Sequence, residues 1–362
     1  MEEMMKKMMK GLVVCFAVLF VAALGIMFYI IYNGGMSYAN LGGKMNLENT
    51  LTFDMSKVEE VAIKYSSEDV VFYIGDTQEL VLKEYMSYKP KERDFSTGYV
   101  EDGKVVIEGK KNHFSLFHFG TKSSREEIYL PKSYAGSVTV STASGNIKSD
   151  EVLNLSLFFA DTASGDIRMN EIYASSIHAG TASGDIRMNE IYASSIHAGT
   201  ASGNINMNLA EGSRDLSTAS GNITVLGGGG DTEADTASGN IKLENAQGIL
   251  ELGCASGDIK VMGAAGGGEF ETASGNVSLQ FDEITASIDA QSTSGNVKLQ
   301  MPQNTAFTLE AATTSGNINT FFDDQLQYNK KGNKASGALN GASDLVISLE
   351  TTSGNIKVLD ND

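Results

Sequence analysis

The stretch Thr142–Ile147, Thr-Ala-Ser-Gly-Asn-Ile, decides the fold of this chain, because close copies of it recur almost to the C-terminus. Its Ser-Gly-Asn/Asp core occurs eleven times, at intervals of 18 to 21 residues and a last interval of 38 residues that holds a degenerate copy, Ser336–Leu339. We interpret the eleven glycines as a structural ladder of turns: Gly145, Gly165, Gly184, Gly203, Gly221, Gly239, Gly257, Gly275, Gly295, Gly316 and Gly354. A repeat of this period indicates stacked supersecondary units, each burying its apolar face only against its neighbours.

The residues on both sides of each glycine alternate in polarity. Apolar residues stand two and four positions after it, as in Ile241 and Leu243, and small or apolar residues stand seven, five and three positions before it, as in Ile177, Ala179 and Thr181. This alternation predicts β-strands, and Ser-Gly-Asn predicts a tight corner because glycine adopts positive φ without steric cost. Two strands and two corners per repeat predict an all-β fold, a right-handed parallel β-solenoid of about twelve coils of 18–20 residues.

One repeat is duplicated without change. Residues 162–180 and 181–199 are the same nineteen-residue string, TASGDIRMNEIYASSIHAG. Insertion of one whole period leaves every contact between neighbouring coils intact, whereas an enzyme cleft built across several coils would tolerate it poorly. The duplication therefore favours a scaffold or binding surface over catalysis.

Residues 11–32 are uncharged and mostly apolar, and their length predicts a transmembrane helix. Lys6, Lys7 and Lys10 precede them, and the next basic residue is Lys44, so we expect a cytoplasmic N-terminus and a solenoid outside the cytoplasm. The alternative is a signal peptide cleaved near residues 37–39. We favour the anchor, because signal peptides have shorter apolar cores, of about 7–15 residues.

The chain is expected to divide into five segments. These are a cytoplasmic N-terminus (1–10), the transmembrane helix (11–32), a glycine-rich stalk (33–45), an N-terminal β section that caps the solenoid (46–135) and the β-solenoid repeat domain (136–362). Residues 321–344 break the repeat rhythm and are expected to form an excursion before a final coil.

Negative charge is concentrated in the repeats. The net charge is −18, but residues 1–140 carry 16 basic and 18 acidic side chains, whereas residues 141–325 carry 7 and 23. So acidic a surface argues against nucleic acid or anionic lipid as its direct ligand.

Two pairs of repeated side chains are candidate metal ligands. His178 and His197 occupy equivalent positions of the duplicated repeat, and Asp166 and Asp185 follow its corner glycines. Zinc needs more ligands than two histidines, and hard cations need several anionic oxygens, while most repeats carry a neutral Asn at the Asp position. We therefore expect ladders of surface and turn-stabilising side chains, with no metal and no cofactor.

No catalytic residue is identified. Serine and threonine are frequent, but none stands in a recognisable arrangement with a histidine and an acid. Carbohydrate-cleaving β-helices use grouped carboxylates, alone or with arginine, and the regular array holds only Arg168, Arg187 and Arg214. Cys254 takes the Thr position of its repeat and is interpreted as a small apolar substitute.

With these features, the chain resembles the bacterial putative-adhesin β-solenoid family, in particular its LiaG-like membrane-anchored members. The resemblance rests on the Thr-x-Ser-Gly-Asn/Asp-Ile repeat, on the lead-in Ile128–Lys132 followed by Val138–Thr142, and on an N-terminal anchor before a β-rich section. It implies an extracytoplasmic, non-enzymatic envelope protein and supplies no catalytic or binding residues.

We therefore interpret the chain as a single-pass cell-membrane protein that displays an acidic β-solenoid outside the cytoplasm, an adhesin or envelope scaffold without catalysis. The alternatives are a β-helix glycan-active enzyme and a passive spacer at the cell surface. Expected partners are the membrane, through the N-terminal helix, and an envelope protein or glycan. Self-association through the coil ends is a further expectation, and nucleic acid is excluded.

Overall fold

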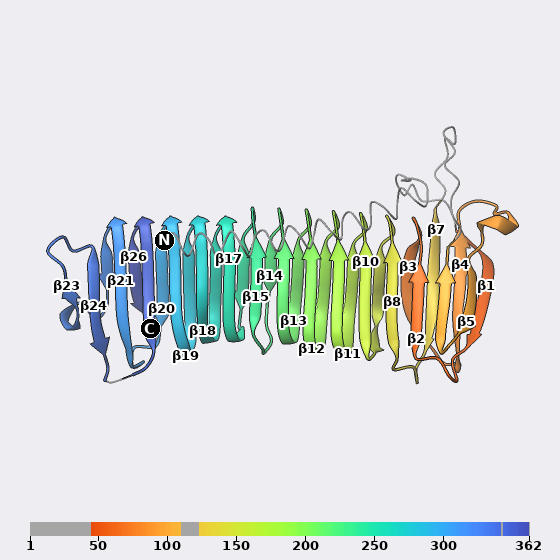
Figure 1. Ribbon diagram of the computed structural model, residues 1–362, viewed down its shortest axis with the longest axis horizontal. Coiled ribbons are helices and arrows are strands. Elements are labelled where there is room, and N and C mark those ends of the chain that lie inside the picture. The colour runs from red at the N-terminus through yellow and green to blue at the C-terminus, as the bar shows by residue number, and fades with distance from the viewer. Residues whose placement is uncertain (1–44, 110–122, 342, 362) are drawn as a thin grey trace, which may run out of the picture. The chain divides into compact units, whose positions relative to one another are not determined.

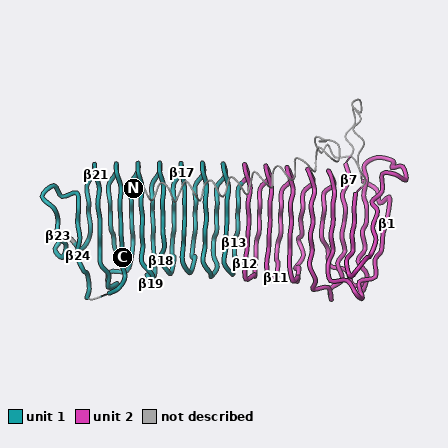
Figure 2. Tube along the Cα trace, in the orientation of Figure 1, with its two compact units in different colours: residues 1–15, 204–362 teal, residues 16–203 magenta. Residues whose placement is uncertain are grey.

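The computed structural model describes residues 45–109, 123–341 and 343–361. In these ranges the chain forms β-strands and two short 3-10 helices, η1 (Glu92–Asp94) and η2 (Asp323–Gln325), and the all-β prediction is confirmed. The chain divides into two compact units (Figure 2). We call residues 45–109 and 123–203 the N-terminal unit, and residues 204–341 and 343–361 the C-terminal unit.

The predicted transmembrane helix at residues 11–32 lies outside the described residues. Among the described residues, no helix has the length and apolar character needed to cross a membrane. The right-handed winding and the count of about twelve coils stay predictions.

The repeats of the N-terminal unit form parallel ladders. β8 pairs with β10 and β10 with β11, while β9 pairs with β11 and β11 with β12. The bounds are β8 Ser137–Thr142, β9 Ile147–Asn154, β10 Leu157–Thr162, β11 Ile167–Thr181 and β12 Ile186–Thr200. Thr142, Thr162 and Thr181 lie opposite one another in successive strands, so the corner position keeps its register from coil to coil, while the β9–β11 ladder shifts its register between Met169 and Glu171.

Parallel pairing begins before the first repeat motif. β2 (Glu60–Lys64) pairs in parallel with β6 (Lys104–Glu108) and β8, and β3 (Asp69–Gly75) pairs in parallel with β7 (Ser124–Pro131) and β9. Antiparallel pairing is made by the strands β1 (Asn46–Asp54), β4 (Glu79–Met86) and β5 (Thr97–Glu101). The parallel ladders thus extend N-terminal to residue 136, because strand alternation alone suffices for a ladder and no Ser-Gly-Asn corner is required.

The C-terminal unit contains the remaining strands. They are β13 Ile205–Thr218, β14 Ile223–Val225, β15 Thr232–Thr236, β16 Ile241–Glu244, β17 Gln247–Ser256, β18 Ile259–Ser274, β19 Val277–Ser294, β20 Val297–Met301, β21 Phe307–Ser315, β22 Ile318–Thr320, β23 Gln327–Tyr328, β24 Lys334–Leu339, β25 Val346–Ser353 and β26 Ile356–Asp360. From β13 to β20 successive coils pair in parallel in chain order.

The last coil departs from chain order. β25 pairs in parallel with both β19 and β21, and β26 with both β20 and β22, so the coil β25–β26 lies between two coils that are consecutive in sequence (Figure 1). β24 pairs antiparallel with β21 and β23, so it forms no coil. The interpretation of Ser336–Leu339 as a degenerate coil is therefore wrong. The expected excursion before a final coil is present as η2, β23 and β24, but that coil is inserted between two earlier ones.

The predicted inward positions are confirmed. Ile241 and Leu243 after the corner, and Ile177 and Ala179 before the next one, are completely buried. Because side chains of a strand alternate between two faces, the residues between them point outward, as Lys242 does. The core is a stack of Ile, Val, Leu and Ala side chains repeated from coil to coil.

Ile241→Ala should lower the free energy of unfolding by about 2–5 kcal/mol, because it truncates a fully buried side chain between two neighbouring coils. The adjacent Lys242→Ala is the matched control. It removes only a half-exposed ion pair, Lys242 Nζ to Glu244 Oε1 at 2.5 Å, so stability should change by about 0–1 kcal/mol. Circular dichroism during denaturation measures both values, and equal effects would contradict the inward register.

Removal of one duplicate, residues 162–180, should leave a folded N-terminal unit shortened by about 4.8 Å. β11 and β12 pair in full register, from Ile167 opposite Ile186 to Thr181 opposite Thr200, so β12 can take the place of β11 on β10. Deletion of nine residues, 162–170, would instead place strand residues at a corner and should disrupt the stack. Melting followed by circular dichroism distinguishes the two, and equal loss of structure would contradict this coil register.

Candidate functional site

Glycine is required at these corners because the backbones of adjacent coils approach each other closely there. A Cβ at Gly165 would lie 1.9 Å from Gly145 O, and one at Gly184 would lie 1.8 Å from Gly165 O. The expected reason, positive φ, was wrong for this corner: of the eleven corner glycines only Gly257 has a positive φ, 157°, which is close to extended. Positive-φ glycines occur instead at the second corner, as at Gly228 (118°) and Gly268 (142°).

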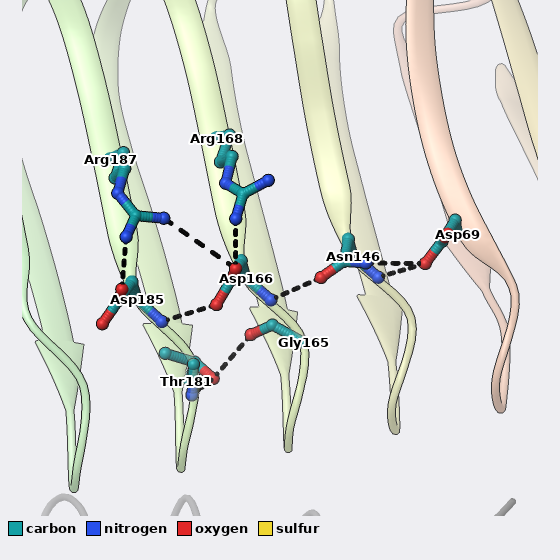
Figure 3. A network of polar contacts seen from close by, with 9 residues as sticks. Asp69, Asn146, Gly165, Asp166, Arg168, Thr181, Asp185 and Arg187 are labelled. Carbon is teal, nitrogen blue, oxygen red and sulfur yellow. Dashed lines mark hydrogen bonds and ion pairs between the residues drawn. The ribbon is translucent and has the colours of Figure 1, made fainter. Parts of the chain in front are cut away.

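At most corners a threonine hydroxyl bonds the corner to the preceding coil, and Ser292 does so at one corner. Thr181 Oγ1 donates to Gly165 O at 3.0 Å and accepts from the backbone N–H of Gly184 at 3.0 Å (Figure 3). The alternation in the sequence indicates only that a small or apolar residue stands at this position. The structure shows that the threonine hydroxyl also makes a specific hydrogen bond between adjacent coils. Cys254, in the same position, is buried and its thiol donates to Gly239 O at 3.1 Å, so it partly replaces the threonine hydroxyl.

The Asn/Asp side chains after the glycines form a ladder of hydrogen bonds. Asn146 Oδ1 accepts the N–H of Asp166 at 2.9 Å, Asp166 Oδ1 accepts the N–H of Asp185 at 2.8 Å, and Asp69 begins the ladder by accepting the N–H of Asn146 (Figure 3). The C-terminal unit continues this pattern in the order 204, 222, 240, 258, 276, 296, 355 and 317. These hydrogen bonds connect the turns of neighbouring coils, so the Asn and Asp side chains have the expected turn-stabilising role.

The carboxylates of Asp166 and Asp185 are paired with arginines. Arg168 donates to Asp166 Oδ2 at 2.6 Å and Arg187 donates to Asp185 Oδ2 at 2.5 Å (Figure 3). With Oδ1 of Asp166 used by the ladder and Oδ2 by arginine, this pair offers no oxygen cage for a cation. Among the described residues, no group of three or more His, Cys, Asp or Glu side chains is arranged to hold a metal.

His178 and His197 lie opposite each other in β11 and β12, as expected. The ring of His178 stacks on Phe159, with centroids 4.3 Å apart, and its Nε2 lies 3.4 Å from Asp161 Oδ1. His197 Nε2 lies 3.1 Å from Ser195 Oγ. The two histidines therefore lie in one outward row of side chains, in which His178 stacks on Phe159.

Arg214 has a structural place. It is almost fully buried, and its guanidinium donates to Thr232 Oγ1 at 2.9 Å, to Gly230 O at 2.8 Å and to Ala210 O. Burial lowers its pKa, while Glu211 and Asp231 oppose that shift. The Arg214 side chain therefore links the second corners of two adjacent coils by hydrogen bonds.

The C-terminal unit carries charged rows on two different strands of each coil. The acidic row consists of five residues that lie opposite one another in successive strands: Asp215, Glu233, Glu251, Glu269 and Asp289. The basic row, on the strands after the corner, consists of Lys242, Lys260, Lys298 and Lys357 with Ser278 among them. The sequence showed that the repeats are acidic, and only strand register places these charges in rows.

The acidic row perturbs its own titration. Burial raises the pKa of Glu233, and the neighbouring Asp215 and Glu251 raise it further. Asp235, two residues along the strand, has its pKa raised to about 7 by burial and then by Glu233 and the surrounding carboxylates. Burial, with a smaller contribution from neighbouring carboxylates, therefore makes proton uptake easier at Glu233 and Asp235 than at an isolated carboxylate.

The N-terminal unit contains a buried carboxyl cluster that is absent from the residues singled out by the sequence. Glu84 in β4 lies opposite Glu126 in β7, and each is only 1% exposed. Glu84 Oε1 accepts from the backbone N–H and hydroxyl of Ser96, whereas Glu126 Oε2 is buried without a hydrogen-bond partner among the described residues. Burial, followed by Glu84 and Glu68, raises the pKa of Glu126 to about 10. The signal was a glutamate at an inward position of an alternating strand, Leu80-x-Leu82-x-Glu84-x-Met86.

Comparison with solved structures gives several distant likenesses. A structure described as a putative cell adhesion protein from Clostridium sporogenes ATCC 15579 is 10% identical, with 88% of this chain and 100% of that chain covered and a TM-score of 0.27. A putative adhesin, BF0245, from Bacteroides fragilis NCTC 9343 is 13% identical, with 62% and 98% covered and a TM-score of 0.41. A structure described as a putative lipid binding protein, from Parabacteroides distasonis ATCC 8503, is 15% identical, with 68% and 96% covered and a TM-score of 0.40.

No curated protein sequence matches the chain. A protein family does, in two overlapping stretches, residues 58–249 and 229–359, which include the first parallel strands, all the Ser-Gly-Asn/Asp corners and the inserted last coil. The family match covers most of the sequence and includes the parallel β-coils and the repeat that forms them. The chain therefore belongs to the Toastrack DUF4097 family.

Proposed function

We propose that this protein is a non-catalytic adhesin or scaffold of the cell envelope, anchored by residues 11–32 and displaying its β-coils outside the cytoplasm. The proposed partner is an envelope protein or glycan with a positively charged surface. The observation that carries this proposal is the acidic row, in which five carboxylates are held at strand spacing on an outward sheet face.

A rigid row of like charges suits recognition by complementarity. Four strand intervals make the row about 19 Å long, and strand pairing fixes the backbone positions that carry its side chains. Complementary charge across an interface mainly raises the association rate and the specificity, and it weakens with ionic strength. The membrane anchor rests on the apolar length of residues 11–32 and on the lysines that precede it.

Capture of a partner by the full chain in detergent tests the interaction. The row variant carries Asp215→Asn, Glu233→Gln, Glu251→Gln, Glu269→Gln and Asp289→Asn. We expect this variant to lose envelope components that the native chain retains at low salt. The control variant neutralises the basic row with Lys242→Gln, Lys260→Gln, Lys298→Gln and Lys357→Gln, and should retain them. Equal capture by all three proteins would contradict the role of the acidic row, and no capture by any of them would favour a passive spacer.

Protease accessibility tests the topology. Protease added to intact cells should degrade the chain beyond residue 33, because the lysines at positions 6, 7 and 10 retain the N-terminus in the cytoplasm. Protection of the repeats together with cleavage of the N-terminus would reverse the proposed orientation.

One observation favours a second candidate, a glycan-active enzyme. Asp235, with its pKa raised to about 7, could serve as a general acid beside the carboxyl groups of the acidic row. Release of reducing ends from cell-wall glycans, abolished by Asp235→Asn, would support this candidate. Absence of release by the native chain leaves the scaffold as the better proposal.

A further inference from the structure

The inserted coil, β25–β26, is fastened in the same way on both sides. Toward β19–β20, Thr351 Oγ1 donates to Gly295 O at 2.8 Å and Asn355 N–H donates to Asn296 Oδ1 at 2.9 Å. Toward β21–β22, the coil accepts the equivalent pair of bonds. Thr313 Oγ1 donates to Gly354 O at 3.0 Å, and Asn317 N–H donates to Asn355 Oδ1 at 3.0 Å.

The neighbouring coil β21–β22 therefore carries the same donors as the inserted coil. Thr313 corresponds to Thr351, and Asn317 corresponds to Asn355. A Cβ would lie 1.9 Å from the preceding carbonyl at Gly316 and 2.0 Å at Gly354, so both corners fit equally closely. If the inserted coil leaves, β21–β22 can pair directly with β19–β20 in the same register, and no ladder edge between them stays unpaired.

The chain segments beside the insertion suit such a movement. Residues 302–306 connect β20 to β21, and residues 340–345 connect β24 to β25. Five residues reach about 16 Å when extended, enough to join adjacent coils or to pass over one. Asn340, with φ 57°, links the two segments by donating to Gln303 O and Thr305 O.

We propose that the inserted coil exchanges between two copies of this protein, the segment Val346–Asp360 of each copy occupying the gap between β19–β20 and β21–β22 of the other. The released coil cannot remain in water, because Ile347, Leu349, Ile356 and Val358 are completely buried in place. The matching gap in a second copy restores all of this burial and every ladder hydrogen bond, which is the energetic basis of a swapped dimer. This partner is independent of the charged rows.

Disulfide trapping between two singly substituted chains tests the exchange. Ser294 and Ser353 are exposed and lie opposite each other in β19 and β25, about 4.8 Å apart and within disulfide range. Full-length Ser294→Cys and Ser353→Cys chains, both with Cys15→Ser, are mixed in detergent, warmed toward their melting midpoint, cooled and oxidised. Exchange should yield a disulfide-linked heterodimer, with a dimer-to-monomer ratio that rises about tenfold for a tenfold increase in concentration.

A matched pair within the sequential part of the stack measures random collision. Ser256 and Ser274 are also exposed and lie opposite each other, in β17 and β18, where no coil can exchange without unfolding its neighbours. Chains carrying Ser256→Cys and Ser274→Cys should give far less heterodimer. Equal yields from the two pairs would overturn the proposal. An intramolecular disulfide in the Ser294→Cys/Ser353→Cys double variant, without heterodimer from the mixed single variants, would also overturn it.

A shortened variant tests the direct closure of β21–β22 on β19–β20. Ser294 and Ser315 are two coils apart with the inserted coil in place, about 9.6 Å, beyond disulfide range. In a Ser294→Cys/Ser315→Cys chain ending at residue 342 the two should become neighbours and form an intramolecular disulfide. A folded shortened chain that fails to form it would contradict the equivalence on which the exchange rests.

Discussion

Gly239→Ala should lower the free energy of unfolding by about 4 kcal/mol or more, a loss seen only when a substitution breaks a specific structural requirement. The added Cβ would lie 1.8 Å from Gly221 O and 2.6 Å from Gly221 C, and the backbone of the preceding coil has no room to withdraw. Relief would require separation of the two coils. That would weaken the bond from Thr236 Oγ1 to Gly221 O, 3.0 Å, and the bond from Asn240 N–H to Asn222 Oδ1, 2.8 Å.

Gly227→Ala is the matched control in the same unit. A Cβ at Gly227 would meet its nearest atoms, Asn208 O and Leu209 Cδ1, at 3.6 and 3.7 Å, which is ordinary van der Waals contact. We expect this variant to lie within about 0.5 kcal/mol of the native protein. Chemical denaturation followed by circular dichroism measures both variants. A Gly239→Ala chain as stable as the control would show that close approach does not select glycine at these corners.

Glu126→Gln should stabilise the N-terminal unit by about 3 kcal/mol at pH 7, and the effect should disappear near pH 4.5. The folded chain holds the Glu126 proton up to about pH 10, because burial and the neighbouring Glu84 and Glu68 raise its pKa. The unfolded chain releases that proton near pH 4.5. Between these values the folded state binds more protons, so native stability falls as pH rises, and a neutral glutamine removes this dependence.

The groups that surround Glu126 come from two parts of the chain. Glu84 lies on β4, and Tyr65 and Glu68 lie in the connection between β2 and β3. Burial, followed by Glu126, raises the pKa of Tyr65 well above its usual range. Thermal melting at several pH values from 4.5 to 8 should show a growing difference between the variant and the native chain. A constant difference would mean that Glu126 is ionised in the folded state.

The adjacent glutamate provides a control of opposite sign. Glu127 accepts from Arg125 Nη2 and from the Tyr129 hydroxyl, both at 2.9 Å. Glu127 is buried and Arg125 is half-exposed, so Glu127→Gln, which removes one charge of this ion pair, should destabilise the unit at neutral pH. The same chemical change at neighbouring positions thus separates an unpartnered carboxyl from a paired one.

Much of the coil could be predicted from the sequence, because its determinants are local. Period-two alternation around the glycine fixes which side chains of a strand face inward, and Ile177, Ile241 and Leu243 are buried as expected. The repeat interval fixes the rise to the next coil, so equivalent residues such as His178 and His197 lie opposite each other. The reason for glycine was misjudged, since the contact between Gly239 and Gly221 involves a residue eighteen positions away, whereas φ is a property of one residue.

The buried carboxyls and the charged rows depend on contacts between strands. Glu126 acquires its raised pKa from burial and from Glu84, which β4 places opposite it, and Asp235 acquires its raised pKa from burial and then from carboxylates on its own and neighbouring coils. The amino-acid composition gives the number of such charges, but the distances between them depend on the register in which the strands pair. The sequence alone therefore indicated an acidic surface without its rows.

The sequence by itself determined the strands, their inward faces and the coil repeat, while only the tertiary structure decided the order of the last coils. The coils around the insertion present equivalent side-chain donors, Asn/Asp acceptors and glycine carbonyls to their neighbours, so the repeat does not specify which coil a given coil contacts. β24 settles the choice by pairing antiparallel with one edge of β21, which leaves only the other edge for β25. The last coil must therefore enter the stack between β19–β20 and β21–β22, because that is where both of its own edges find partners.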